Sequence, residues 1–347
     1  MTKTIRKMSP GLFDYDNRIE KLGKASHPLD RLDRRIDWEI FRADLETIFA
    51  KPAKGHGGRP RHDVVMMFKI LVFERYYNLS DEQAEFQIND RLSFQKFLGL
   101  TLADPVPDQK TIWLFREELG RDGGVDKLFS RFDHHLMEMG LVGREGKMID
   151  ASFVDVPRQR NSRDDNDTIK NGKVPESFSE NAHRKSQKDL DARWTKKGNE
   201  VHYGYKNHVK ANGRTKLIEG YAVTDASVHD SQVVDELIAE GDSTLHADSA
   251  YRSEEIEQKL SRNGIESCIH EKGYRNKLLT EGQKKSNHEK SRVRARIEHI
   301  FGHMTHAMHD GLKLRFIGMR RIAAGIGFLN LVYNMARYEQ IVRLKLA

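Results

Sequence analysis

The sequence predicts a mixed α/β protein in which a sheet flanked by helices follows an all-α N-terminal domain. Up to about residue 145, apolar residues recur mostly at helical spacing. From Gly146 onward, runs of strand length alternate with amphipathic segments of helix length. The resulting order β, β, β, α, β, α, β, α is typical of a sheet with helices on its faces.

The composition limits the classes of protein that are compatible with this chain. Its 347 residues are enough for two domains, and 37% hydrophobic with 32% charged residues excludes a membrane protein or a disordered one. The formal net charge of +7 favours a polyanionic partner, although only weakly. The single cysteine, Cys268, which we expect to be buried, excludes a disulfide framework and suits a reducing cytoplasm.

No segment of the sequence predicts a membrane partner. The N-terminus lacks the apolar stretch of a signal peptide. The longest apolar-leaning stretch, residues 322–336, falls short of the ~20 residues that span a bilayer. It also contains two asparagines, which favours a buried helix. We therefore expect a cytoplasmic or nucleoid-associated protein.

The N-terminal region combines short helices with a basic hinge. Helices are expected over residues 29–49, 62–77, from 80, 92–98 and 112–119. Ser80 and Gln83 have the form of a capping box. Together with the glycine-rich hinge at 55–61, which carries Arg59 and Arg61, this pattern suggests a helix-turn-helix-like DNA-binding region. A plain helical packing domain remains the alternative.

The second part carries the predicted sheet. Strands are expected over 147–154, 202–211, 216–227, 244–248 and 265–270, and helices over 230–240, 254–263, 289–308 and 319–344. We divide the chain into a helical DNA-binding and dimerisation domain (1–145), a catalytic domain (146–312) with an irregular polar insertion (156–200), and a C-terminal helix packing on the core (313–347).

Three acids are candidates for chemistry. Asp150 lies in an otherwise apolar strand, where a carboxylate is costly unless it is paired or metal-bound. Asp248 ends a short strand, and if the two strands are neighbours both carboxylates face one point. Hard oxygen donors suit Mg²⁺ or Mn²⁺, and Glu298, on a helix, is the candidate third ligand of a two-ion site.

Each acid also has an explanation without chemistry. A strand Asp can be hydrogen-bonded to a loop, and Asp248 precedes a turn that it can cap. Glu298 lies four residues after Arg294, so an ion pair within the helix is the default. Spacing alone leaves these alternatives open.

A resemblance adds to the case for chemistry. The segments MIDASFV, DARWTKKG, HYGYKNHV, VTDASVHDS, HADSAYRS and RARIEHIFG, in this order, closely resemble the transposases of the insertion sequence five family. Those enzymes are DDE transposases with a ribonuclease-H-like core. The resemblance implies a catalytic, metal-binding triad of Asp150, Asp248 and Glu298, with two Mg²⁺ or Mn²⁺ ions. It covers nearly the whole chain, since the N-terminal segment GGRPRHDVVMMFKILVF also resembles the family.

The chain departs from the related motif at two positions. Relatives carry Tyr three residues before the conserved Arg and Lys seven residues after the Glu, whereas this chain has Ser291 and Thr305. Phosphate contacts made by those two residues in relatives are therefore in doubt here. Lys290 and His303 are the nearby substitutes.

Two basic stretches predict the DNA contacts. Residues 156–210 carry thirteen Lys or Arg against eight acids, and residues 271–296 carry nine against three. Planar rings at Phe178, Trp194, Tyr203 and Tyr205 are interleaved with the first stretch and suit stacking on bases. Trp194 is the main stacking candidate, with an anchor to the core as the alternative. The predicted DNA-binding residues are Arg59, Arg61, Arg193, Trp194, Lys196, Lys197, Arg292 and Arg294.

The resulting hypothesis is a bacterial insertion-sequence transposase. It would bind terminal inverted repeats as a homodimer, cut at the transposon end and join the free 3′-hydroxyl to target DNA. Two alternatives are a hydrolytic nuclease on the same core and a non-catalytic DNA-binding protein derived from a transposase.

Overall fold

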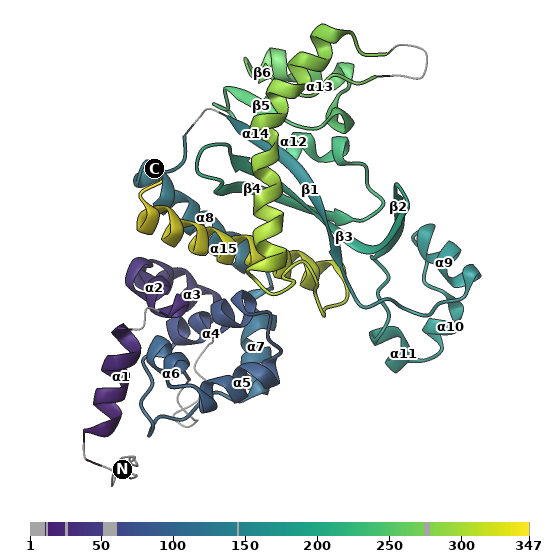
Figure 1. Cartoon of the computed structure of the whole chain (residues 1–347). Coiled ribbons are helices and arrows are strands. Elements are labelled where there is room, and N and C mark those ends of the chain that lie inside the picture. Colours follow the sequence, from purple (N-terminus) through teal and green to yellow (C-terminus); the bar gives the residue numbers. More distant parts are fainter. Residues whose placement is uncertain are drawn as a thin grey trace, which may run out of the picture.

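The computed structural model describes residues 11, 13–24, 27–50, 61–143, 146–273 and 278–346. A helical N-terminal part lies beside a mixed sheet, and the last helix, α15 (Met319–Leu344), contacts both (Figure 1). Arg59 lies outside the described residues, as do residues 144 and 145 at the expected domain boundary. Within the described ranges, no helix combines the length and apolarity needed to cross a bilayer.

The N-terminal part is helical, as predicted. Its helices are α1 (Asp14–Lys24), α2 (Pro28–Arg35), η1 (Trp38–Phe41), α3 (Arg42–Ile48), α4 (Val64–Tyr76), α5 (Asp81–Asp90), α6 (Leu92–Leu98), α7 (Gln109–Leu119) and α8 (Gly124–Glu138). The capping box that starts α5 is confirmed, because Ser80 and Gln83 each accept a hydrogen bond from the other's backbone N–H. Asp63 and Asp108 cap α4 and α7 in the same part of the chain.

The sheet is mixed and is built around its longest strands. Its strands are β1 (Lys147–Asp155), β2 (Arg193–Lys197), β3 (Glu200–Asn212), β4 (Ile218–Asp225), β5 (Thr244–His246) and β6 (Glu266–Ser267). β3 pairs antiparallel with β1, β2 and β4, whereas β1, β5 and β6 run parallel to one another. Parallel strands end at the same edge of the sheet, so this half positions side chains that follow β5 and β6 beside those of β1.

Several predicted bounds are wrong. The helix expected over 230–240 ends at 237, as η2 (Asp230–Val233) and α12 (Val234–Leu237), and the strand expected over 265–270 is limited to β6. η3 (Ser249–Tyr251) and α13 (Glu254–Arg262) follow β5. The helix predicted from 289 is α14 (Glu281–His306), which begins eight residues earlier because Thr280 and Gln283 form a capping box.

The insertion is more ordered than the sequence suggests. It contains α9 (Arg163–Lys170), α10 (Glu176–Ser179) and α11 (Ala182–Ser186), and its last part forms β2. Ile169 and Phe178 are buried within it. The carboxylate of Asp189, which is 1% exposed, accepts hydrogen bonds from Tyr205 Oη at 2.7 Å and from the backbone N–H of Gly318 at 3.2 Å. These contacts fasten the insertion to β3 and to the start of α15.

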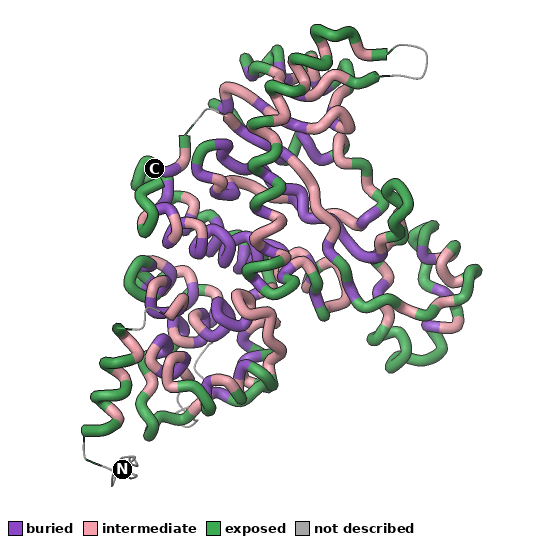
Figure 2. The backbone as a smooth tube through the Cα atoms, in the orientation of Figure 1, coloured by how far each residue is buried: buried purple, intermediate pink, exposed green. Residues whose placement is uncertain are grey.

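Helix α15 is buried along most of its length, as Figure 2 shows. The two asparagines in its apolar stretch are both buried and hydrogen-bonded. Asn330 pairs with Asn207 of β3, and Asn334 pairs with the backbone of Ile218 in β4. One hydrophobic cluster contains residues of α2 to α8, the sheet, α14 and α15. Cys268, expected to be buried, is only half-buried.

Candidate active site

Asp150 and Asp248 come together through the parallel pairing of β1 and β5. Met148 lies opposite His246 in this register. Two residues further along each chain, Asp150 and Asp248 follow on the same side, because side chains alternate with a period of two. Asp150 Oδ1 accepts a hydrogen bond from the N–H of Ala151 at 2.8 Å, and Asp248 caps η3 through the N–H of Ser249 at 2.5 Å.

Glu298 reaches this pair through Arg294. Both lie on α14, which packs across β1 and β5 (Figure 1). The guanidinium of Arg294 is 3.5 Å from Asp150 Oδ2 and donates to Glu298 Oε1 at 3.0 Å. The ion pair expected within the helix is therefore present, but the same arginine also contacts the acid on β1. Glu298 itself is 59% exposed, whereas Asp150 is 18% exposed.

The environment of Asp150 disfavours its charge. Burial raises the pKa of this carboxyl to about 6, and the charge of Asp248 acts in the same direction. Opposing contributions come from the hydrogen bond of Ala151 and from the positive charges of Arg294 and Lys197. Two carboxylates lie close together at a partly buried point, which is the electrostatic setting of a cation site.

The structure adds residues that the sequence reasoning missed. His270 follows β6 as Asp248 follows β5. Thr244 pairs with Glu266, and beyond the two strands the N–H of His270 donates to the carbonyl of Ala247 at 3.2 Å. The pKa of His270 is lowered by burial and responds to both Arg294 and Asp248. The parallel-strand rule that joins Asp150 and Asp248 would have identified it.

Behind the two aspartates lies a buried phenol. Tyr251 is 1% exposed and its Oη has no hydrogen-bond partner among the described residues. Burial and the charges of Asp150, Asp230 and Asp248 raise the pKa of Tyr251 well above its ordinary value. Asp230 is paired with Lys206 at 2.7 Å. No sequence pattern indicates that these residues converge, because they come from separate strands and turns.

The donor set fits a hard divalent ion, although the carboxylates are not gathered around one point. Within the described ranges, no three His, Cys, Asp or Glu side chains lie close enough to hold a metal. Asp150 and Asp248 adjoin one another, while Arg294 stands between Asp150 and Glu298. The buried Nε of Arg294 has no hydrogen-bond partner in the described part of the chain. The arginine supplies positive charge where a bound cation would supply it.

The predicted DNA-binding residues of β2 differ in what they contact. Trp194 is 41% exposed, packs against Tyr203 and lies beneath the guanidinium of Arg158 at 5.8 Å. Lys196 and Lys197 are exposed, and Lys197 acts on the pKa of Asp150. Arg193, in contrast, donates to the backbone carbonyls of residues 169, 190 and 192 and fastens the insertion.

Three of the four aromatic residues expected to suit base stacking do not suit it. Phe178, Tyr203 and Tyr205 are at most 4% exposed, so they belong to the core of the insertion and sheet. The prediction was wrong for these three because interleaving with basic residues in sequence does not determine burial. Trp194 alone among them has an exposed ring.

The remaining candidates lie on α14 and near α3. Arg292 is exposed, and Arg61 is exposed with its guanidinium on the carbonyl of Phe49. Ser291 and Thr305 each donate to a carbonyl one turn earlier in α14. Of the two substitutes, Lys290 donates to the carbonyl of residue 269 at 2.9 Å, and the ring of His303 contacts that of residue 333 in α15.

Two family models match most of this chain. Residues 17–118 match a family model described as a transposase domain, and residues 143–335 match one described as a transposase DDE domain. Among solved structures, the chain is similar to the piggyBac transposase synaptic complex with hairpin DNA, with 13% identity over 92% of this chain and 76% of the other and a TM-score of 0.46. The DDE model covers more than half of the sequence, and the chain therefore belongs to the family of transposases with a DDE domain.

Proposed function

We propose that this protein is the transposase of a bacterial insertion sequence, of the insertion sequence five family, and that its core is ribonuclease-H-like. It cuts DNA at the ends of the element and joins those ends to target DNA. The observations that support this proposal are that the β1–β5 register brings Asp150 and Asp248 together, and that Arg294 contacts both Asp150 and Glu298. The match to a DDE transposase domain supports the same chemistry.

Asp150, Asp248 and Glu298 would hold two Mg²⁺ or Mn²⁺ ions. Such ions, when bound, supply stabilisation of the charge on the attacking and leaving oxygens of a phosphodiester. The carboxylates would position and hold the ions. Asp150 would do so best when it is ionised, above the pKa of about 6 that burial gives it. Arg294 balances the carboxylates without the ions and would shift towards a phosphate oxygen of the DNA when they bind.

The residues around the triad would position the DNA. Lys197 lies close enough to affect Asp150, so its ammonium can bind the phosphate next to the bond that is cut. The exposed face of Trp194 can stack on a base displaced at the end of the element. Lys196, Arg292 and Arg61 extend the positive surface, and Arg59 remains a prediction outside the described residues.

The partners follow from the proposed reaction. Two inverted-repeat ends must be held together for joining, so a homodimer forms at least on DNA. The helices before residue 145 would bind the repeats and contribute to the dimer. The site of action is the bacterial cytoplasm, at the nucleoid, where both the ends and the target DNA lie.

The test uses Glu298→Gln, with Glu289→Gln as the matched control on the exposed surface of the same helix. Each protein is incubated with Mg²⁺ and DNA that carries the element's ends and a target duplex. Wild type and Glu289→Gln should cut and join. Glu298→Gln should lose at least about a hundredfold in rate, the upper end of the cost of altering even an outer partner of a metal.

Other outcomes select the alternatives. Cutting without joined products would indicate a hydrolytic nuclease. Binding of the ends without cutting by wild type would indicate a non-catalytic DNA-binding protein. Equal cutting by Glu298→Gln and wild type would reject the assignment of Glu298.

A further inference from the structure

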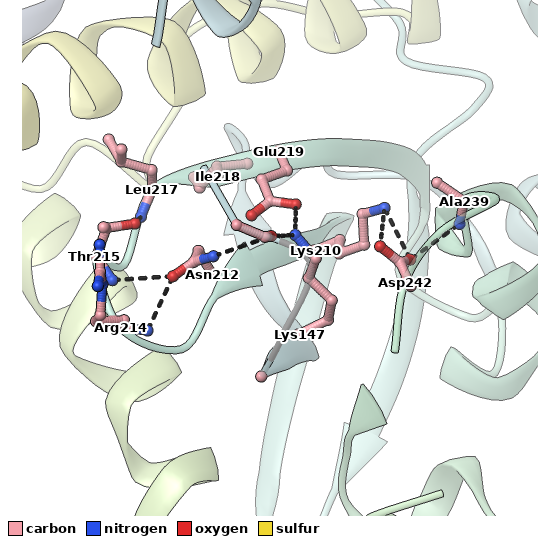
Figure 3. Close-up of polar contacts among 12 residues, drawn as sticks. Lys147, Lys210, Asn212, Arg214, Thr215, Leu217, Ile218, Glu219, Ala239 and Asp242 are labelled. Atoms are coloured by element: carbon pink, nitrogen blue, oxygen red, sulfur yellow. Dashed lines mark hydrogen bonds and ion pairs between the residues drawn. The ribbon is translucent and has the colours of Figure 1, made fainter. Parts of the chain in front are cut away.

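The turn between β3 and β4 has a preformed shape. Asn212 Oδ1 accepts from the backbone N–H of Arg214 at 2.9 Å and of Thr215 at 3.0 Å (Figure 3). The backbone of Lys216 is in the left-handed region, with φ of 62°, and its N–H donates to the carbonyl of Asn212 at 2.8 Å. The turn therefore presents Arg214 and Lys216 from a fixed backbone.

One flank of α14 faces this turn. Arg292, Arg296, His299 and His303 recur at the spacing that forms a stripe along a helix. The guanidinium of Arg296 donates to the carbonyl of Gly213 at 2.8 Å, and Lys216 Nζ lies 2.8 Å from His299 Nδ1. Two residues correspond to about 200° around a helix, so this stripe lies on the flank opposite Arg294 and Glu298.

The last helix brings a further cation to the same turn. Arg337 of α15 donates to the carbonyl of Thr215 at 2.7 Å, and Tyr333 Oη donates to the carbonyl of Lys216 at 2.9 Å. Three elements far apart in sequence, the β3–β4 turn, α14 and α15, therefore converge on one small region. We call Arg214, Lys216, Arg296 and Arg337 the turn cluster.

The turn cluster lacks compensating acids. None of its four members is within ion-pair distance of a carboxylate in the described part of the chain. The pKa of Lys216 is lowered by burial and by the positive charges of Arg337 and Arg296. Lys147 and Lys210, on neighbouring strands, are in contrast paired with Glu219 and Asp242 (Figure 3).

Uncompensated cations held close together cost stability unless an anion binds them. We propose that the turn cluster binds a backbone phosphate of duplex DNA, on the side of α14 away from the catalytic acids. This inference rests on the proposed function for the identity of the anion, since DNA is the polyanion on which a transposase acts. The turn cluster would give the protein a second contact with the duplex, beyond the cleaved end.

A structural role for the same residues is the competing explanation. Arg296 and Arg337 each donate to a carbonyl of the turn, so replacing either would also loosen the backbone. Lys216 separates the two explanations, because among the described residues its ammonium contacts only the ring of His299 and donates to no backbone carbonyl. Loss of its charge should leave the turn intact.

The experiment measures the affinity of the full chain for a short duplex of arbitrary sequence over a range of salt concentrations. The proteins are wild type, Lys216→Gln, Lys216→Arg and, as control, Lys127→Gln at an exposed lysine of α8. Each phosphate contact contributes about 0.9 to the slope of log K against log salt. Lys216→Gln should lower this slope by about one contact and weaken binding several-fold. Lys216→Arg and Lys127→Gln should match wild type.

Thermal unfolding without DNA and cleavage by wild type complete the test. Lys216→Gln should melt no lower than wild type, because it relieves repulsion; a clear fall in Tm would overturn the proposal in favour of a structural role. If the salt slope of Lys216→Gln equals that of wild type and the wild type cleaves DNA, phosphate binding by the turn cluster is overturned and the proposed function stands. If Lys216→Gln lowers the salt slope but the wild type does not cleave DNA, the turn cluster stands and the proposed function is overturned. A wild type that binds no DNA overturns both.

Discussion

Arg294 links two of the three candidate acids, Asp150 and Glu298. It contacts Asp150 at 3.5 Å and Glu298 at 3.0 Å, so the ion pair expected within the helix is present and does not exclude Glu298 from the candidate site. The sequence allowed both explanations because a spacing of four residues fixes only the pair on the helix. The contact with β1 depends on how α14 packs on the sheet.

The buried amide pair shows the same limit of sequence reasoning. The asparagines in the apolar stretch of α15 predicted a buried helix, and this was confirmed. Their partners could not be predicted, because Asn207 is 123 positions away from Asn330. Amide side chains are also uncharged, so charge complementarity does not indicate which residue pairs with them.

Removing one amide of this pair should be costly. Asn207 and Asn330 are both 0% exposed and exchange hydrogen bonds of 2.8 and 3.1 Å. Asn330→Leu and Asn207→Leu should each lower the free energy of unfolding by about 1–3 kcal/mol, because each leaves a buried amide unsatisfied. The double variant should cost less than the sum. Denaturant unfolding of all four proteins measures this coupling, and additive effects would contradict it.

At the scale of elements, the strongly apolar segments were predicted best. The single helix expected over 29–49 is wrong, because that segment is divided into α2, η1 and α3. The helix predicted over 319–344 has those bounds, whereas α14 begins earlier than its apolar pattern suggests. Residues 281–288 are polar and follow a cap, so only the capping box at Thr280 marks the start. The helices α9 to α11 span at most eight residues each, too few to show a period.

The residues of the candidate site that lie in a recognisable local sequence pattern could be predicted, and those brought together only by the tertiary structure could not. Asp150 was identified because it is an acid in an apolar strand, and Asp248 because it was expected to end a short strand; in the structure that strand, β5, ends two residues earlier. His270 required the same rule to be applied to β6, and Tyr251 required the tertiary structure. The turn cluster combines residues from three elements, so no local sequence pattern predicts it.

Two glycines in the long helices should respond oppositely to the same change. A Cβ added at Gly302 of α14 would meet no described atom within 4 Å apart from the adjoining backbone of its own helix. Gly302→Ala should therefore stabilise by about 0.5–1 kcal/mol through lower backbone entropy of the unfolded chain. A Cβ at Gly327 of α15 would overlap the phenol oxygen of Tyr221, which bonds Asp126. Gly327→Ala should therefore destabilise by about 1–3 kcal/mol. Thermal unfolding compares them, and equal signs would reject this explanation.

At the scale of the whole molecule, the helical part and the sheet share one hydrophobic cluster. Phe68 of α4 packs edge-on against Phe328 of α15 at 5.8 Å, and the same cluster includes Met148 of β1 and Ile297 of α14. A shared core of this kind couples the two parts, so a change at their boundary should affect the stability of both. The division into domains at residue 145 remains a prediction about function.

One group at this boundary should make stability depend on pH. Asp133 of α8 faces Glu219 of β4, with Lys147, Lys210 and His134 also acting on it. Burial, followed by the charge of Glu219, raises the pKa of Asp133 from 3.8 to about 7. The folded state therefore retains a proton that the unfolded state has lost, and this contribution to stability falls as the pH rises from about 4 to about 7.

Asp133→Asn should remove that contribution. Near pH 4 the variant should differ little from wild type, because the unfolded state still binds part of the proton that Asp133 holds in the fold. At pH 8 it should be more stable by about 1–2 kcal/mol, less than the full shift implies because the side chain is partly exposed. Glu138→Gln, at an exposed carboxyl of the same helix, should show no such trend. Denaturant unfolding at the two pH values measures the difference. The other titrating groups are common to wild type and variant, so a gain that is equal at both pH values would mean that folding does not raise the pKa of Asp133.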